Sequence, residues 1–277
     1  QIVPQNFFGK VLQKNAQKMC SELFPGTAFP QNVSGTLPEN FPLMGKQDKD
    51  RLAITEPFND GPLQLFLSEQ SKRYKIWLLG GTVPLVSDNP EKVFATSLLF
   101  NPDGECIARY DKIHLFDVNI TARETHRESH SFIRGNKIIM NKVDGVNIGL
   151  TISYDLRFPN LYRQLAKKGA QIILIPAAFT VPTGKAHWET LIRARAIENS
   201  VFIVATNMCG THHSGRKTYG HSILFDPWGK TENKCLAKEK ILKVSKEFNI
   251  ESVETVSYTH LRAHETDSYL VCRLLLE

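Results

Sequence analysis

Cysteine is scarce in this chain, and its five cysteines are scattered along 277 residues. Small secreted proteins that depend on disulfides have many closely spaced cysteines, so an odd and unclustered set argues against a disulfide framework. We interpret all five as reduced and structural: Cys20, Cys106, Cys209, Cys235 and Cys272.

Long apolar runs are missing as well. The longest run, "IILIPAAF" at 172–179, is far shorter than the roughly 20 residues that a membrane helix needs. No charged-then-apolar leader opens the sequence. We therefore expect a cytoplasmic protein that does not enter a membrane.

Blocks of one charge are also absent. Lys and Arg number 34 against 28 Asp and Glu, but the basic residues are spread out and form no stripe of the kind that follows a nucleic-acid backbone. We expect no nucleic-acid partner, and a mild positive field suits small anionic substrates. An apolar content of 42% is enough for one large core.

The two ends differ from the middle. Residues 256–277, "VSYTHLRAHETDSYLVCRLLLE", resemble the translation of a sequencing adapter, and we expect them to be an artefactual tail. The alternative is an amphipathic C-terminal helix. We predict one domain over 1–255 with an irregular N-terminal part, a helix near 9–23 and a truncated C-terminus, and Gln1 in place of Met indicates a fragment.

Apolar strands alternate with amphipathic helices through the middle of the chain. This pattern predicts an α/β protein with two sheets covered by helices. The expected strands are 76–85, 93–100, 105–110, 146–152, 171–176, 201–206 and 221–226, and the expected helices are 61–75, 159–170 and 186–200.

Ser153 in "TISYDLRFP" directly follows a buried strand and precedes a helix. The chain must turn sharply there, which presents the side chain at the end of the strand and points the backbone N–H of Tyr154 at the same place. This is the geometry of a nucleophile with an oxyanion donor. The alternative is an ordinary helix cap.

Several separate motifs, in order, resemble the nitrilase superfamily of carbon–nitrogen hydrolases. They are "LPENFPLMG", "YDKIHLF", "RESHSFIRG", "GLTISYDLRFPNLYRQLAKKGAQIILIPAAF" and "TGKAHWETLIRARAIENSVFIVATN". The likeness spans about 35–250 and is greatest to the branch of deaminated glutathione amidase and ω-amidase. It implies a four-layer α-β-β-α sandwich, an amidase acting without a cofactor, and a homodimer.

The resemblance places the family's catalytic glutamate at Glu39, its lysine at Lys112, a second glutamate at Glu128 and its nucleophilic cysteine at Ser153. A thiolate attacks the amide, a cation and a backbone N–H stabilise the oxyanion, and a carboxylate moves the proton. The alternatives are a surface glutamate and a solvated lysine.

A serine at 153 predicts impaired catalysis, because a hydroxyl stays protonated at neutral pH and needs a strong base nearby. Three explanations remain open. They are a one-base sequence change, a deliberate substitution, and a natural relative that binds without catalysis.

We expect Tyr154, Arg157, Phe179 and Thr180 to contact the substrate. Arg157 could pair with a substrate carboxylate, or instead with Asp155 or another acid inside the protein, and the aromatic ring of Phe179 could belong to the core.

The segment "CGTHHSGRKTYGHS" at 209–222 lacks a second ligand cluster, so we predict no metal there. Its His-His-x-x-x-x-x-Tyr-Gly-His pattern resembles deaminated glutathione amidase more than ω-amidase, and this resemblance implies a loop that influences substrate choice. "TGKAH" at 183–187 lacks the glycine of a phosphate loop, and Trp188 is expected to pack in the core. The sequence predicts an amidase for a small carboxylated amide of the deaminated glutathione type, with ω-amidase specificity or a non-catalytic binding protein as alternatives.

Overall fold

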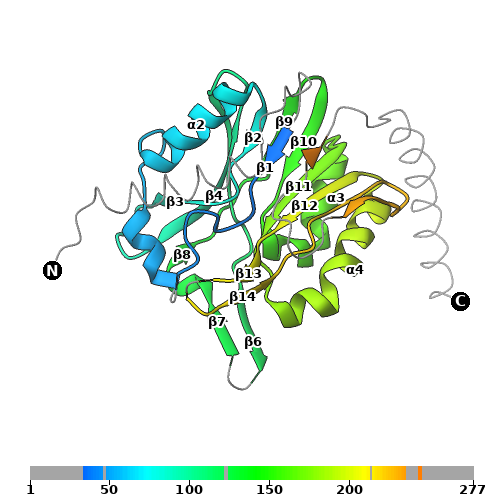
Figure 1. Cartoon of the computed structure of the whole chain (residues 1–277). Coiled ribbons are helices and arrows are strands. Elements are labelled where there is room, and N and C mark those ends of the chain that lie inside the picture. Colours follow the sequence, from blue (N-terminus) through cyan, green and yellow to red (C-terminus); the bar gives the residue numbers. More distant parts are fainter. Residues whose placement is uncertain (1–33, 46–47, 122–123, 213, 235–242, 245–277) are drawn as a thin grey trace, which may run out of the picture.

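The computed structural model describes residues 34–45, 48–121, 124–212, 214–234 and 243–244 (Figure 1). The helix expected at 9–23 and the tail at 256–277 lie outside the described residues.

Two β-sheets form the centre of the molecule (Figure 1). In the first sheet the order is β17–β1–β2–β4–β3, with β5 and β8 also paired to β4. Its strands are β1 (Ser34–Thr36), β2 (Trp77–Leu79), β3 (Val83–Val86), β4 (Val93–Phe100), β5 (Cys106–Asp111), β8 (Phe132–Ile133) and β17 (Lys243–Val244).

The second sheet has the order β16–β15–β12–β11–β10–β9. Its strands are β9 (Met140–Val143), β10 (Val146–Leu150), β11 (Ile172–Ala177), β12 (Phe202–Asn207), β15 (Ile223–Phe225) and β16 (Thr231–Lys234). The three central strands β10, β11 and β12 run parallel, so their carboxyl ends meet at one edge of the sheet.

Helices cover the outer face of each sheet. Helix α2 (Pro62–Tyr74) packs on the first sheet, and α3 (Pro159–Lys167) and α4 (Val181–Asn199) pack on the second (Figure 1). The result is the four-layer α-β-β-α sandwich that the sequence predicted.

The side chains of β11 explain why the two sheets stack. Ile172 and Leu174 belong to the apolar cluster that joins the two sheets, whereas Ile173 and Ile175 belong to the cluster under α3 and α4. Because successive side chains of a strand point to opposite faces, a continuous apolar strand must be covered on both sides.

The strand expected over 76–85 is in fact two strands. Both β2 and β3 pair with β4, and the chain bends between them at Gly81, which has a φ of +37°. A Cβ atom at Gly81 would lie 2.1 Å from the carbonyl oxygen of Pro38, so only glycine allows this close approach. The bend thereby lets the loop after β1 pass over the edge of the sheet.

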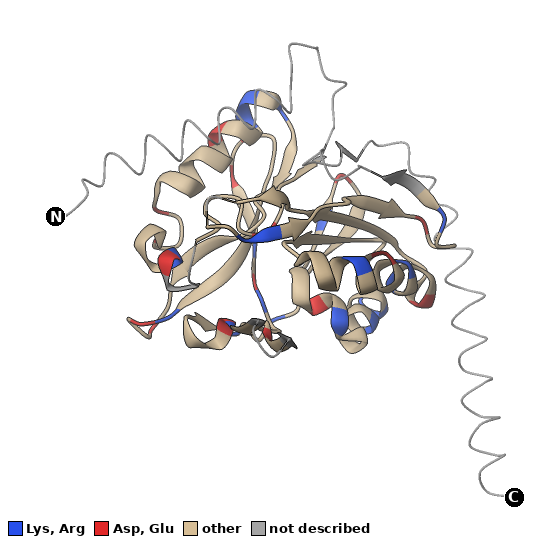
Figure 2. Ribbon diagram, turned by 60° about the horizontal axis from the view of Figure 1, so that its bottom comes forward, with Lys and Arg blue, Asp and Glu red and all other residues tan. Residues whose placement is uncertain are grey.

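Two small hairpins complete the fold. One consists of β6 (Asp117–Thr121) and β7 (Glu124–Arg127), and the other of β13 (Cys209–Thr211) and β14 (Lys217–Tyr219). Lys and Arg are dispersed over several elements of the fold (Figure 2). Within the described residues, every helix is too short or too polar to cross a bilayer.

Candidate active site

Ser153 lies in a tight turn at the end of β10. The backbone of Ser153 has a φ of +45°, and the 3₁₀ helix η3 (Ser153–Arg157) begins at this residue. A left-handed conformation at a non-glycine residue costs about 1 kcal/mol. The surrounding structure must therefore hold the turn.

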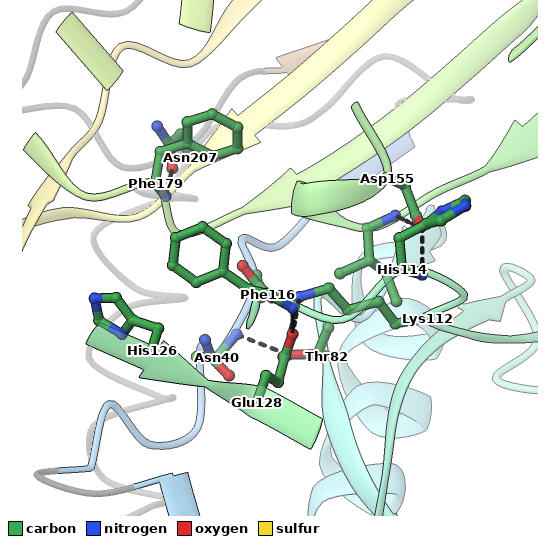
Figure 3. A network of polar contacts seen from close by, with 12 residues as sticks. Asn40, Thr82, Lys112, His114, Phe116, His126, Glu128, Asp155, Phe179 and Asn207 are labelled. Carbon is green, nitrogen blue, oxygen red and sulfur yellow. Dashed lines mark hydrogen bonds and ion pairs between the residues drawn. The ribbon is translucent and has the colours of Figure 1, made fainter. Parts of the chain in front are cut away.

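Asp155 provides much of the stabilisation of this turn. Its carboxylate is fully buried and accepts hydrogen bonds from the Tyr110 hydroxyl at 2.7 Å and from the Ile152 N–H at 2.8 Å through one oxygen. Through the other oxygen it accepts from the His114 N–H at 3.0 Å and contacts His114 Nδ1 at 2.7 Å (Figure 3). These contacts tie the turn to β5 and to the segment that follows it.

The same cluster has two further properties. Burial raises the pKa of Tyr110 well above its usual value, and the nearby Asp155 adds to that rise, so the hydroxyl remains a donor. The His114 ring stacks on Phe158 with centroids 3.6 Å apart. The turn that carries Ser153 is thus fixed by both polar and aromatic contacts.

Glu39 comes from the loop after β1. Its side chain is buried at 5% exposure, and the loop is anchored by a hydrogen bond from the Asn40 N–H to the Thr82 hydroxyl at 2.8 Å. The Thr206 hydroxyl donates to the Leu37 carbonyl at 3.4 Å and so links the loop to the second sheet.

Lys112 follows β5 directly and is 1% exposed. Its Nζ lies 2.9 Å from Glu39 Oε1 and 2.8 Å from Glu128 Oε2 (the contact to Glu128 is seen in Figure 3). Burial acts to lower the pKa of Lys112, but the two carboxylates outweigh it and the pKa lies above its ordinary value. The ammonium group therefore stays charged.

Glu128 accepts a hydrogen bond from the Phe116 N–H at 2.6 Å in addition to the contact with Lys112. The pKa of Glu128 is raised, because burial and the charge of Glu39 outweigh the attraction of Lys112. With both glutamates ionised, this group of three side chains carries one negative charge in excess.

One pocket, with about 510 Å³ of empty space, joins these groups. Seven of the eight predicted site residues line it: Glu39, Lys112, Glu128, Ser153, Tyr154, Phe179 and Thr180. Ser153 is 7% exposed, and among the described residues its hydroxyl has no hydrogen-bond partner. The predicted groups therefore share one cavity, while Ser153 lacks an adjacent base.

Arg157 is the eighth predicted residue, and it stands outside the residues that line the pocket. Its guanidinium lies over the rings of Tyr154 and Phe179, at 5.8 and 5.7 Å, and 3.2 Å from His187 Nδ1. Burial lowers its pKa. The alternative of an ion pair with Asp155 is wrong, because Asp155 is occupied by Tyr110 and His114.

Phe179 and Thr180 emerge from the end of β11, as predicted. The Phe179 N–H donates to Asn207 Oδ1 at 2.9 Å (Figure 3), and the Thr180 hydroxyl caps α4. Trp188 is buried and belongs to the core under α4, as expected. The segment 183–187 forms the first turns of that helix.

The 209–222 segment contributes to the pocket through Arg216. His212 contacts the Thr218 hydroxyl at 2.6 Å, and Cys209 is buried and outside any disulfide. Within the part of the chain that the structure describes, no group of three or more His, Cys, Asp and Glu side chains could hold a metal ion.

The sequence reasoning missed several residues of the pocket wall: Asn40, Arg51, Phe116, His126, Ala178, Thr183 and Arg216. For two of these residues the sequence contained a signal. Asn40 is next to Glu39, and Thr183 lies one helical turn after Thr180. The approach of His126 to Arg216 joins residues 90 positions apart, and no local pattern predicts it.

Comparison with known proteins identifies the family and the fold. The profile of the family "Carbon-nitrogen hydrolase" matches residues 35–246. A deaminated glutathione amidase of Yersinia enterocolitica is 46% identical over 177 residues, which are 63% of this chain and 62% of that protein. A deaminated glutathione amidase of Mus musculus is 38% identical over 222 residues, which are 79% of this chain and 68% of the mouse protein. The present chain thus spans less than two thirds of the bacterial relative.

Among solved structures, Saccharomyces cerevisiae Nit3, a member of branch 10 of the nitrilase superfamily, superposes with a TM-score of 0.74. It is 30% identical, and the match covers 91% of this chain and 88% of Nit3. From the profile match and the shared fold, the chain belongs to the carbon–nitrogen hydrolase family of the nitrilase superfamily.

Proposed function

We propose that this chain has the scaffold of an amidase that hydrolyses the C–N bond of a small carboxylated amide, and that Ser153 impairs its turnover. The observation that carries the proposal is the cavity in which Glu39, Lys112 and Glu128 face the turn of Ser153. Two buried ionised groups, Glu39 and Lys112, with the partly buried Glu128 beside them and a strained turn facing them, are costly to stability and typical of a reaction centre.

With cysteine at 153, the reaction has two balanced steps. In the first, the sulfur attacks the amide carbon, Glu39 takes the thiol proton and passes it to the nitrogen, and the C–N bond breaks to release the amine. In the second, water attacks the thioester, Glu39 takes a water proton and returns it to the sulfur, and the acid leaves.

The oxyanion of both steps would be stabilised by the ammonium of Lys112 and by the N–H of Tyr154. The second carboxylate, Glu128, holds Lys112 in place and keeps it charged. Each of these roles follows from position and charge, and none requires a cofactor.

A serine fits this mechanism poorly. Its hydroxyl is not ionised at neutral pH, and the hydrogen bonds of the two carboxylates go to Lys112 and to the Phe116 N–H rather than to Ser153. We therefore expect the Ser153 chain to turn over about a thousandfold or more slowly than a Ser153→Cys variant.

The substrate we propose is an amide that carries a carboxylate, of the deaminated glutathione type. The relatives from Yersinia and mouse bear the name deaminated glutathione amidase. Arg157 supports a carboxylated substrate, because its guanidinium leans over Tyr154 and Phe179 on the pocket wall without a carboxylate partner among the described residues. The specificity of an ω-amidase is the alternative within this class.

A protein that binds the same amides without hydrolysing them is the second candidate, and Ser153 favours it. We also propose a cytoplasmic homodimer. Cys106 and Cys209 are not joined in a disulfide, which suits a reducing compartment. Ile197 on α4 and Trp228 in the turn between β15 and β16 are exposed apolar side chains, and Ile197 lies against Gly229 of that turn, which suits a surface for a second copy.

The test is amine release from carboxylated amides by the Ser153 chain and by Ser153→Cys. Restored turnover in the cysteine variant, lost again in Ser153→Cys with Glu39→Gln, supports the amidase. A folded cysteine variant without activity, together with tight binding of the amides by the Ser153 chain, supports the binding protein.

A further inference from the structure

A cavity with about 1170 Å³ of empty space lies on the outer face of the first sheet. It is lined by residues of β4, β5 and β8 and of the segment that follows β8. Arg109 of β5 lines it and pairs with Leu98 of β4, whose side chain packs in the cluster under α2, so the cavity opens on the same face as that helix. The described residues that line this outer-face cavity all differ from those that line the pocket of Ser153. It is therefore a separate site.

Gly135 brings the segment after β8 against the end of β5. Its N–H donates to the Lys112 carbonyl at 2.7 Å, and a Cβ atom at this position would lie 2.1 Å from the carbonyl oxygen of Asp111. So close an approach requires a residue without a Cβ atom. The basic residues of the same segment, Arg134 and Lys137, are thereby held beside β5, where both line the outer-face cavity.

Positive charge is in excess in the outer-face cavity. Arg134 and Lys137 are exposed, and neither has an ion-pair partner among the described residues. Arg109 donates through Nε to Asp111 Oδ1 at 3.0 Å, and the Thr96 hydroxyl donates to the same oxygen at 2.6 Å. The two terminal nitrogens of Arg109 have no acceptor within the part of the chain that the structure describes. Three cations against one carboxylate leave an excess of two positive charges.

Apolar side chains form another part of the cavity wall. Phe94, Ile133 and Ile139 line the cavity and are each partly exposed. The Arg109 guanidinium lies 5.4 Å from the ring centroid of Phe94 and 5.0 Å from that of Phe58. These ring contacts hold the guanidinium plane in one orientation. The cavity thus presents an oriented cation next to apolar surface.

We propose that the outer-face cavity binds a small molecule that carries a dianionic phosphate group on a flat apolar body. Two excess positive charges match a phosphate monoester above its second pKa, which is about 6. The arginine fork matches phosphate oxygens, and the apolar wall accepts the body of the ligand. Cations gathered at one cavity repel each other, and a bound dianion offsets that repulsion. The site is independent of the proposed amidase function, because none of its side chains takes part in that reaction.

Isothermal titration calorimetry of the full Ser153 chain tests this site at pH 8 and low salt, in a buffer free of phosphate. The probes are phenyl phosphate, phenyl sulfate and inorganic phosphate. Phenyl sulfate has the same ring and a single charge, and inorganic phosphate has the charge without the ring. We expect phenyl phosphate to bind about tenfold more tightly than either, because one charged hydrogen bond and the burial of a ring are each worth roughly that factor.

Variants of the exposed cations place the probe in the cavity without disturbing the core. Arg134→Gln and Lys137→Gln should each weaken the binding of phenyl phosphate about tenfold, and the double variant should abolish measurable binding. Lys142→Gln is the matched control, because Lys142 is an exposed cation of β9 outside the cavity wall. It should leave the affinity within about threefold. Circular dichroism checks that each variant is folded.

Four results would overturn the inference. They are no binding of phenyl phosphate, equal affinity for phenyl phosphate and phenyl sulfate, unchanged binding in the double variant, and an equal loss in Lys142→Gln. Sedimentation with vesicles of phosphatidylcholine and phosphatidic acid tests the other source of a phosphate monoester. Capture by these vesicles without binding of phenyl phosphate would assign the cations to a lipid surface and reject the small molecule. Because each measurement is binding and not turnover, an inactive Ser153→Cys variant would reject the amidase and leave this site standing.

Discussion

Replacing Asp155 by asparagine tests whether the buried carboxylate holds the turn of Ser153. Each oxygen of Asp155 accepts from one backbone N–H, that of Ile152 or that of His114. In asparagine one of these oxygens becomes an NH₂ group. The Tyr110 hydroxyl or the His114 ring can reverse its role and accept, but a backbone N–H cannot.

One buried N–H therefore faces a donor in either orientation of the amide. An unsatisfied buried donor costs about 1–3 kcal/mol, and the loss of charge-assisted bonds adds to this. We expect Asp155→Asn to lower the free energy of unfolding by about 2–4 kcal/mol. Tyr110→Phe removes one donor and leaves the carboxylate otherwise bound, so it should cost about 1 kcal/mol.

Urea unfolding of the full chain at pH 7 measures these differences. Asp103→Asn is the control, since Asp103 is an exposed partner of Lys75 at 3.4 Å and such surface pairs contribute little. It should change the free energy of unfolding by less than about 0.5 kcal/mol. An Asp155→Asn variant as stable as this control would refute the role given to the carboxylate.

Two further predictions concern pH and assembly. The activity of Ser153→Cys should fall at acid pH with an apparent pKa above 4.5, the ordinary value of glutamate. The reason is that the pKa of Glu128 is raised and that its protonation removes one counter-charge of Lys112. Glu128→Gln cannot titrate, so a pH–rate profile whose acid limb stays in place in this variant would contradict the prediction. Ile197→Glu should convert a dimer to a monomer in sedimentation equilibrium, because it puts a charge into the proposed apolar surface beside Gly229, the neighbour of Trp228 in the chain. Val86→Glu, also at an exposed apolar site, should leave the dimer intact. A dimer that survives Ile197→Glu would contradict the proposed surface.

The layers of the fold could be predicted from local patterns, since apolar periodicity reports which faces must be covered. The strand predicted at 93–100 agrees with β4 residue for residue. The continuous apolar character of segment 76–85 predicts a single strand there. The break at Gly81 depends on the approach of Pro38, a contact between distant residues that periodicity does not encode.

In the candidate site, too, local features could be predicted from the sequence and contacts between distant residues could not. The turn at Ser153 could be predicted from a strand followed by a helix, and Glu39, Lys112 and Glu128 came from the resemblance to a family. The cluster of Asp155 with Tyr110 and His114 joins residues 41 to 45 positions apart. Such contacts exist only after the two sheets have stacked, so the sequence alone suggested Arg157 as an alternative partner for Asp155.

The structure has the destabilising features of a reaction centre around Ser153, whose hydroxyl is a poor nucleophile. Ser153 keeps a left-handed backbone at φ +45°, and Lys112 remains buried between two carboxylates. Binding a carboxylated amide requires neither, because a cation at the wall is sufficient for that. A strained nucleophile turn and a buried charged triad increase a rate only when a reactive atom occupies position 153. For this reason we expect a single sulfur atom at that position to restore hydrolysis without any other change to the pocket.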